Sequence, residues 1–448
     1  MFERTSRDSR AASVVGDLLK PKLVTSRRGL IRAAAQCAAI GVAGSVAGAE
    51  RQALAASTDR KFLYFFARGG WDATPLDPKF AGDGFSAVGG TDMDAGTVLG
   101  QQGNLSWSSG PDRLAMDAYF AAWGHRSAII RGVNVHSVAH DTGEYWALTG
   151  GGINTRPDWP TILAAGGATD YPMPHLVFSG PNYPGRLGSA VVRGGGGSLL
   201  DLIDGSIMGY SDQNAPAFEL SVDAMIDAHV RTRAVRYGVG RTGLAKIRTD
   251  AFSDSLDRST ELEGRQFEAG LAGAAAGTLD QALMALEVMR LGLTRCAMIE
   301  IPGGWDTHGG NGAVGGQLDD FFSVLDELQS HMARTPGLSS EWLADEVVIA
   351  AGSELGRTPK FNGAMGRDHW TYTSMFLAGA GIQGDTVAGA TDESLLGVPI
   401  DLGTGRASNS GVMIGTEHVG ATLLELGNVD PEEFLPGVPS IRALIQGA

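Results

Sequence analysis

Cysteine is scarce in this sequence, and its scarcity limits how the fold can be held together. The chain has 448 residues but only two cysteines, Cys37 and Cys296. If Cys37 is lost with an N-terminal signal peptide, no intramolecular disulfide can form. A mature protein of this size must then be stabilised by a large hydrophobic core, in one α/β domain or two smaller ones.

Positive charge and long apolar runs are also in short supply. The chain carries 35 Lys and Arg against 50 Asp and Glu, a formal net charge of −15, which argues against a nucleic-acid partner bound through a basic surface. No apolar run is long enough for a stable transmembrane helix. The glycine run 194–197 lacks the Lys-Ser/Thr of a phosphate-binding P-loop. Glycine itself is abundant, and the 65 glycines predict many tight loops.

The N-terminus has the pattern of an export signal. Residues 26–32 contain the adjacent pair Arg27 and Arg28, and a small, weakly apolar stretch covers residues 33–49. Small-residue cleavage sites follow at 47–49 and 53–55. We predict that residues 1–55 are a twin-arginine (Tat) signal peptide, so the Tat translocase is a partner during export. Residues 56–448 are then periplasmic or secreted, with no transmembrane segment. The alternative is a basic, disordered tail before a small core helix.

Apolar runs and helical periodicity alternate along the mature chain. Strands are predicted at 61–67, 127–135, 175–179, 296–301, 346–351 and 374–377. Helices are predicted at 112–123, 279–291, 317–332 and 417–426, and a further helix is predicted to end near Thr149. This alternation predicts an α/β fold with a mostly parallel sheet sandwiched by helices. Residues 181–275 break the pattern and are predicted to form a mainly helical insertion or cap.

Carboxylates and imidazoles follow three of the predicted strands. In α/β proteins, ligands and metals collect at the carboxyl ends of parallel strands. Carboxylate oxygen and imidazole nitrogen together are typical ligands of zinc, manganese or iron. The side chains at these strand ends, and in a loop shortly after the third strand, are the candidate metal ligands Asp72, Asp306, His308, Glu354, Asp368 and His369.

Each of these residues also has a structural interpretation. Asp306 could cap a helix while the neighbouring histidine is solvated. Glu354 ends a very apolar strand and is either a metal ligand or the buried partner of Arg357. His136 and His140 are four residues apart and share a helical face if the helix begins early. Two satisfied structural histidines are at least as common in that arrangement.

Several motifs occur together in one order. They are residues 26–32, 68–72, His140 with 149–150, 304–308, and above all 353–359 with Asn362 and 366–370. In these motifs the chain resembles the Tat-exported bacterial domain-of-unknown-function family 1501, which is placed in the alkaline phosphatase/sulfatase-like superfamily. The resemblance spans nearly all of the chain from about residue 60 onward, except the insertion. It implies an alkaline phosphatase-like core.

The resemblance also implies a site with two metals. In the superfamily, acids like Asp72 and Glu354 hold one metal. An Asp-and-His loop like Asp306 and His308, with a late histidine like His369, holds the other. Two neighbouring metals of this kind clamp the attacking and leaving oxygens of a phosphoryl or sulfuryl group.

Two positions depart from the superfamily pattern. His140, nine residues before Thr149, stands where these hydrolases have Ser, Thr or a modified Cys as the nucleophile. Leu355 stands where a histidine ligand usually follows the late-strand acid. Either His140 is a ligand or base and a metal-bound water attacks, or hydrolysis has been lost.

The sequence therefore supports two hypotheses. The first is an exported hydrolase that uses one or two divalent metal ions (zinc, manganese or iron) on a phosphate or sulfate ester. Its substrate is an anionic small molecule or polymer, His140 is catalytic, and Arg357 or Arg367 neutralises the substrate. The second is a non-catalytic periplasmic or cell-surface binding or assembly protein that keeps the fold.

Overall fold

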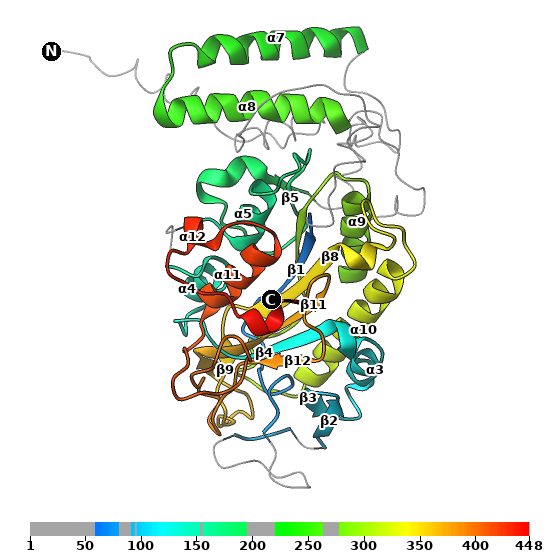
Figure 1. Cartoon of the computed structure of the whole chain (residues 1–448), viewed down its shortest axis with the longest axis vertical. Coiled ribbons are helices and arrows are strands. Elements are labelled where there is room, and N and C mark those ends of the chain that lie inside the picture. The colour runs from blue at the N-terminus through cyan, green and yellow to red at the C-terminus, as the bar shows by residue number, and fades with distance from the viewer. Residues whose placement is uncertain are drawn as a thin grey trace, which may run out of the picture.

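The computed structural model describes residues 59–79, 91–94, 96–152, 156–194, 220–262 and 277–447. The predicted signal peptide at 1–55 and glycines 195–197 lie outside these ranges. The described chain is built around a central sheet with helices on both faces (Figure 1). The prediction of an α/β fold is therefore confirmed.

The central sheet has eight strands, and seven of them run in the same direction. The strand order is β12 (Thr386–Ala388), β4 (Ser127–Asn134), β11 (Tyr372–Gly379), β8 (Val347–Ser353), β1 (Lys61–Ala67), β7 (Cys296–Glu300), β5 (His175–Val177) and β6 (Val191–Arg193). All neighbouring pairs are parallel except those of β11, which is antiparallel to both β4 and β8. The sheet is mostly parallel, as the sequence predicted.

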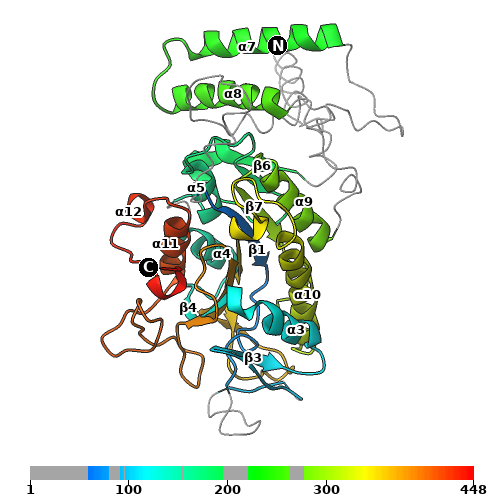
Figure 2. The ribbon, with the colours of Figure 1, turned by 45° about the vertical axis from the view of Figure 1, so that its right-hand side comes forward.

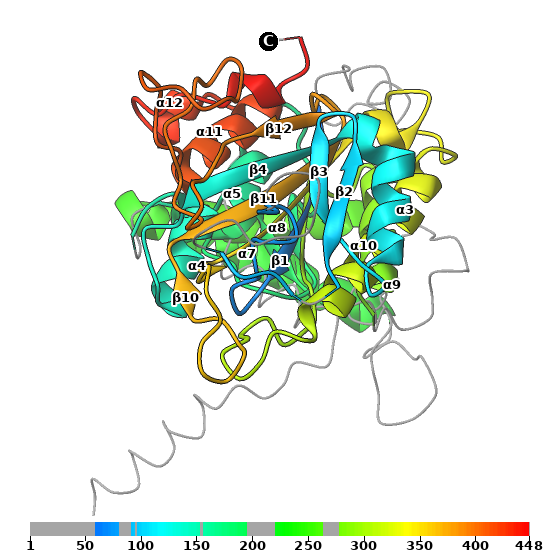
Figure 3. The same cartoon turned by 90° about the horizontal axis from the view of Figure 1, so that it is seen from below.

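Strand β1 explains why its sequence is a continuous apolar run. Its side chains alternate between two hydrophobic cores, so Phe62, Tyr64 and Phe66 lie on one face and Leu63 and Phe65 on the other. The first core is completed by α4 (His140–Thr149), α5 (Trp159–Ala165) and α11 (Thr416–Leu426). The second is completed by α3 (Leu114–Trp123), α9 (Thr278–Arg290) and α10 (Val314–Met332). Figures 2 and 3 show these two helical layers on opposite sides of the sheet.

Smaller elements fill the connections between these layers. A hairpin is formed by β2 (Val98–Gln102) and β3 (Leu105–Ser109), and β9 (Gly356–Arg357) pairs with β10 (His369–Trp370). The short helices are η2 (Gly124–Arg126), η3 (Gly185–Ala190), η5 (Leu343–Asp345), α12 (Pro431–Phe434) and η6 (Arg442–Leu444).

Part of the predicted insertion at 181–275 belongs to the central sheet. Strand β6 falls inside this range, pairs with β5 and extends the central sheet. Helices α7 (Leu220–Gly238) and α8 (Gly243–Leu262) form a hairpin at one end of the molecule (Figures 1 and 2). Ala234 and Leu256 pack in a small core with Met284 and Val288 of α9. Among the described helices, none combines the length and hydropathy needed to cross a membrane.

Candidate metal centre

The candidate residues meet at one edge of the sheet, because the ends of the strands lie level there. In the parallel pairs, Phe66 of β1 is opposite Glu300 of β7, and Ala67 is opposite Ser353 of β8. The loops that follow these strands therefore begin side by side. Strand β11 runs the other way, so its start lies at this same edge, and β10 immediately precedes it.

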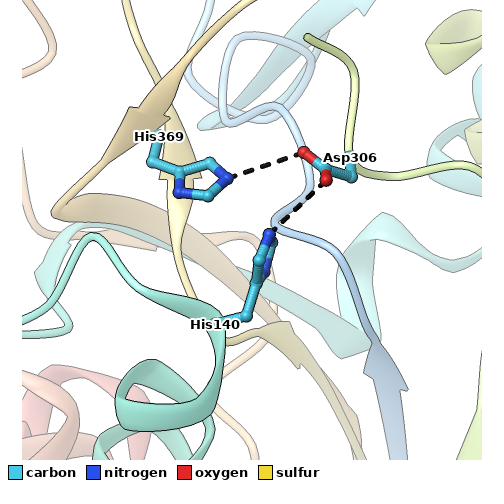
Figure 4. Close-up of side chains that lie close together, drawn as sticks. All are labelled: His140, Asp306 and His369. Carbon is cyan, nitrogen blue, oxygen red and sulfur yellow. Dashed lines mark ion pairs between the residues drawn. The ribbon is translucent and has the colours of Figure 1, made fainter.

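Three side chains from separate segments converge at this edge. His140 is the first residue of α4, Asp306 lies in the loop after β7, and His369 lies in β10. One ligand atom from each lies within 4.8 Å of the other two. The Asp306 carboxylate sits between the imidazoles, with Oδ2 3.6 Å from His140 Nε2 and Oδ1 3.5 Å from His369 Nε2 (Figure 4). Two imidazoles and a carboxylate form a possible metal-binding triad.

Both imidazoles of the triad are oriented through their other nitrogen. His140 Nδ1 lies 2.7 Å from Glu354 Oε1, and His369 Nδ1 lies 2.6 Å from the carbonyl oxygen of Val138. Each oxygen accepts the Nδ1 proton, which leaves a lone pair on Nε2 facing the triad. His369 Nε2 is buried and has no hydrogen-bond partner among the described residues. A buried nitrogen of this kind needs an explanation, and a bound cation provides one.

Glu354 supports the triad from behind. Its side chain is fully buried, and Oε1 accepts hydrogen bonds from Gly69 N at 2.6 Å and from His140. The sequence left two roles open, metal ligand or partner of Arg357; in the structure Glu354 is the hydrogen-bond partner of His140, a residue of the candidate triad. The hydrogen bond from His140 to Glu354 raises the pKa of that imidazole above its ordinary value.

Arg357 positions the carboxylate of the triad. Its guanidinium is fully buried and lies 2.8 Å from Asp306 Oδ1, while its other donors reach the carbonyl oxygens of Gly69, Gly70 and Arg367. Desolvation acts to raise the pKa of Asp306, but Arg357 and the nearby histidines outweigh it and lower that pKa. Asp306 is therefore held ionised and in place, and Arg357 has no free donor facing solvent.

A second imidazole–carboxylate pair flanks the triad. His308 Nδ1 lies 2.8 Å from Asp368 Oδ1, and His308 Nε2 lies 3.3 Å from Asp306 Oδ1. Asn362 donates a hydrogen bond to Asp368, and this bond, followed by that of His308, lowers the pKa of Asp368. His308 is not among the three residues whose ligand atoms lie within 4.8 Å of one another. It is a neighbour of the triad with a carboxylate behind it.

Two glycines permit the segments of the site to approach. Gly69 has φ +123°, and a Cβ there would lie 2.9 Å from the backbone nitrogen of Asp306. A Cβ on Gly143 of α4 would lie 2.5 Å from the carbonyl oxygen of Glu354. The end of β1 and the first turn of α4 can therefore reach the site only with glycine at these positions.

Other predicted site residues have different partners. Asp72 and Arg367 are both fully buried and form an ion pair of 2.8 Å with each other, and Asn311 donates to Asp72 at 3.0 Å. Arg367 also donates to three backbone carbonyl oxygens. These two residues lie outside the triad, and so does Leu355, whose side chain is part of the hydrophobic core.

The remaining histidines near the site are structural. Helix α4 begins at His140, so His136 is not on it, and the early helix start on which a shared helical face depended is not found. His136 Nε2 instead lies 3.2 Å from Glu417. His418 Nδ1 accepts a hydrogen bond from Gly415 N at the start of α11.

Sequence reasoning missed an arginine beside the site. Arg68 directly follows β1, its side chain is 53% exposed, and its Nε lies 2.5 Å from Glu144 Oε1. Glu144 is buried on α4 one turn after His140, and its Oε2 accepts a hydrogen bond from the Tyr183 hydroxyl at 2.5 Å. The spacing of four places His140 and Glu144 on one face of α4, and this is the sequence signal that could have indicated Glu144 and its partner Arg68.

A comparison with known families assigns the chain. A family model described as "Protein of unknown function (DUF1501)" matches residues 108–401, more than half of the sequence. The matched range includes all three residues of the triad together with Glu354 and Arg357. A search of curated proteins finds no match. The chain therefore belongs to the DUF1501 family of proteins of unknown function.

Proposed function

We propose that this protein is an exported metal-dependent hydrolase that acts on a phosphate or sulfate ester. The observation that carries the proposal is the triad of His140, Asp306 and His369, with the buried, unpartnered Nε2 of His369 facing the carboxylate. Three protein ligands of this kind, with a position left open, are characteristic of catalytic rather than structural metal sites. Zinc, manganese and iron all suit two imidazoles and a carboxylate.

The proposal uses one ion rather than the two that the resemblance implied. Within the part of the chain that the structure describes, the triad is the group that offers converging ligands. Asp72 is neutralised by Arg367, and Glu354 is used to orient His140. When bound, a divalent ion acts as a Lewis acid toward an oxygen of the ester.

His308 is the general acid–base in this proposal. Its Nδ1 is held by Asp368, its Nε2 faces the triad, and its side chain is 44% exposed, so a proton can be exchanged there. As the oxygen of an attacking water bonds to phosphorus or sulfur, Nε2 takes up the proton that the water loses. The bond to the ester oxygen breaks, and the leaving oxygen keeps that electron pair and takes the proton from His308 Nε2, which returns the imidazole to its starting state.

Arg68 is the residue we propose to bind the anionic substrate. Arg357 and Arg367, which the sequence suggested for this role, are buried and bound to acceptors within the protein. Glu144 anchors only the Nε side of Arg68, so its outer N–H groups remain exposed at the edge of the site. A guanidinium fixed on one side by a carboxylate is pre-organised to bind phosphate or sulfate oxygens.

The location follows from the sequence. The twin-arginine pattern at 26–32 supports export by the Tat translocase to the periplasm or beyond, with cleavage near residue 55. Tat exports folded proteins, which suits a protein that acquires its metal before export.

Metal content and ester hydrolysis test the proposal together. We expect about one equivalent of a divalent metal in the purified protein, lost on chelation. We also expect metal-dependent hydrolysis of p-nitrophenyl phosphate, bis(p-nitrophenyl) phosphate or p-nitrophenyl sulfate. H369A should lose both, whereas H229A, an exposed histidine of α7, should lose neither. A protein that binds no metal after loading, or an H369A variant that keeps full metal content, contradicts the site.

The second candidate is a non-catalytic binding or assembly protein of the cell envelope. The observation that favours it is His140, which occupies the position of the superfamily nucleophile. A protein that binds one metal through the triad but hydrolyses none of the three esters would support this second function.

A further inference from the structure

A second site lies on the α4–α12 side of the molecule. It is a cavity of about 610 Å³, in the size range of small-molecule pockets. The cavity is lined by residues of α4, η3 and α12, and by residues of the loops that precede α5 and η3. Among them are Tyr145, Arg156, Asn182, Tyr183, Arg186 and Phe434. None of the triad residues lines this cavity.

Arg156 is the feature that points to a ligand. It is partly buried in the cavity wall, yet its guanidinium makes no hydrogen bond or ion pair among the described residues. Burial lowers the pKa of Arg156, and the nearby carboxylate of Glu417 opposes this shift without cancelling it. Arg186 adds a second cation at the mouth, where its side chain is 70% exposed and only 3.7 Å from the exposed Glu433. A cavity with unfilled guanidinium donors favours an anionic ligand.

Aromatic rings form the other wall. Tyr145 and Tyr183 stack with ring centroids 4.0 Å apart, and the Tyr183 hydroxyl is fixed by the buried Glu144. Phe434 lies below Arg186, whose guanidinium carbon is 6.0 Å from the ring centroid. These rings offer rigid apolar surface beside hydrogen-bonding groups, and Asn182 and Glu433 contribute polar atoms to the same wall.

We propose that this cavity binds an acidic sugar, with Arg156 holding its phosphate, sulfate or carboxylate group and the tyrosine pair packing against its ring. The C–H face of a sugar ring can pack against the tyrosine rings. The hydroxyls of the sugar can form hydrogen bonds with Asn182 and Glu433 in the same wall. The net charge of −15 argues against a polynucleotide as the ligand. This site does not require hydrolysis at the metal centre, so it stands or falls separately from the proposed function.

Isothermal titration of the chelator-treated full chain tests the assignment without any contribution from a bound metal. The probes are glucuronate, glucose 6-phosphate, glucose and inorganic phosphate. We expect both acidic sugars to bind, and both glucose and inorganic phosphate to bind at least about tenfold more weakly, because each lacks one half of the recognised structure. R156Q should weaken the acidic sugars by about tenfold or more.

R406Q provides the matched control, because Arg406 is an exposed arginine that does not line the cavity. It should bind the acidic sugars as the unmodified protein does. The assignment is overturned if no acidic sugar binds, or if R156Q binds them as tightly as R406Q. Inorganic phosphate that binds as tightly as glucose 6-phosphate overturns the sugar part. All of these outcomes leave the metal content and ester hydrolysis of the protein as a separate question.

Discussion

Replacing Glu354 with glutamine removes the charge behind His140 while it keeps the shape of the side chain. Glu354 Oε1 accepts from His140 Nδ1 at 2.7 Å and Gly69 N at 2.6 Å, and an amide oxygen can accept both bonds. Oε2 lies 3.0 Å from the Ser353 hydroxyl, whose single proton is also directed at the Ala67 carbonyl oxygen at 2.5 Å. An amide N–H at this place donates to Ser353 Oγ, so we expect E354Q to fold.

The expected loss is one of metal affinity. A carboxylate behind a ligand histidine makes that imidazole a stronger ligand, and removing such a partner typically lowers metal affinity about 10–100-fold. This corresponds to about 1.4–2.8 kcal/mol of binding free energy. The direction agrees with the bond to Glu354 that raises the pKa of His140, because the glutamine variant has a less basic imidazole at the same position.

A competition titration measures this directly. Chelator-treated protein is titrated with Zn²⁺ against a fluorescent chelator at one fixed pH, and thermal unfolding of the metal-free protein is followed separately. E341Q, which changes an exposed glutamate in the same way, is the control and should keep the affinity of the unmodified protein. If E354Q folds and binds Zn²⁺ within about twofold of E341Q, the role assigned to Glu354 is refuted.

Three further predictions concern the fold that carries the site. Burial lowers the pKa of His175 to about 4. As the pH falls below 6.5, His175 therefore becomes protonated in the unfolded chain before it does in the folded protein. The free energy of unfolding, measured with urea, should therefore keep its full His175 contribution above pH 6.5 and fall by about 3 kcal/mol as the pH is lowered to 4. In H175Q the free energy of unfolding should depend less steeply on pH over this range. In K61M, Glu346 loses a buried partner at 2.6 Å, which should lower the free energy of unfolding by about 3 kcal/mol; a loss below about 1 kcal/mol would contradict this. G143A places a Cβ 2.5 Å from the Glu354 carbonyl oxygen and should weaken Zn²⁺ binding, whereas G316A, with no atom within 4 Å of its Cβ, should not.

The elements of the core could be predicted from the sequence because burial on both faces leaves a strong pattern. Strand β1 was predicted at 61–67 and is found at Lys61–Ala67, since every one of its residues is buried. Strand β6 was missed because its apolar run is only Val191 and Val192, directly followed by Arg193 and glycine. The reversed direction of β11 was also not predictable, because apolar content does not record the direction in which a strand runs.

Of the six candidate metal ligands, Asp306 and His369 lie in the triad, together with His140, which the sequence left as a ligand or base. Asp306, His308 and His369 are brought together as the resemblance implied, and His140 joins them. The partners of the buried charges were not predictable, because loop geometry decides whether Arg357 reaches Glu354 or Asp306. The sequence shows that a carboxylate follows a strand. Which side chain that carboxylate contacts depends on the conformations of two or three other loops.

The reversed strand β11 has a consequence for when the proposed metal site can form. His140 and His369 are 229 positions apart in the sequence, and they meet only after β4, β8 and β11 have paired in the sheet. A chain that has not completed these long-range pairings has no triad to offer, so high-affinity metal binding should arise late in folding. Metal uptake during refolding would then be a signal of the completed sheet.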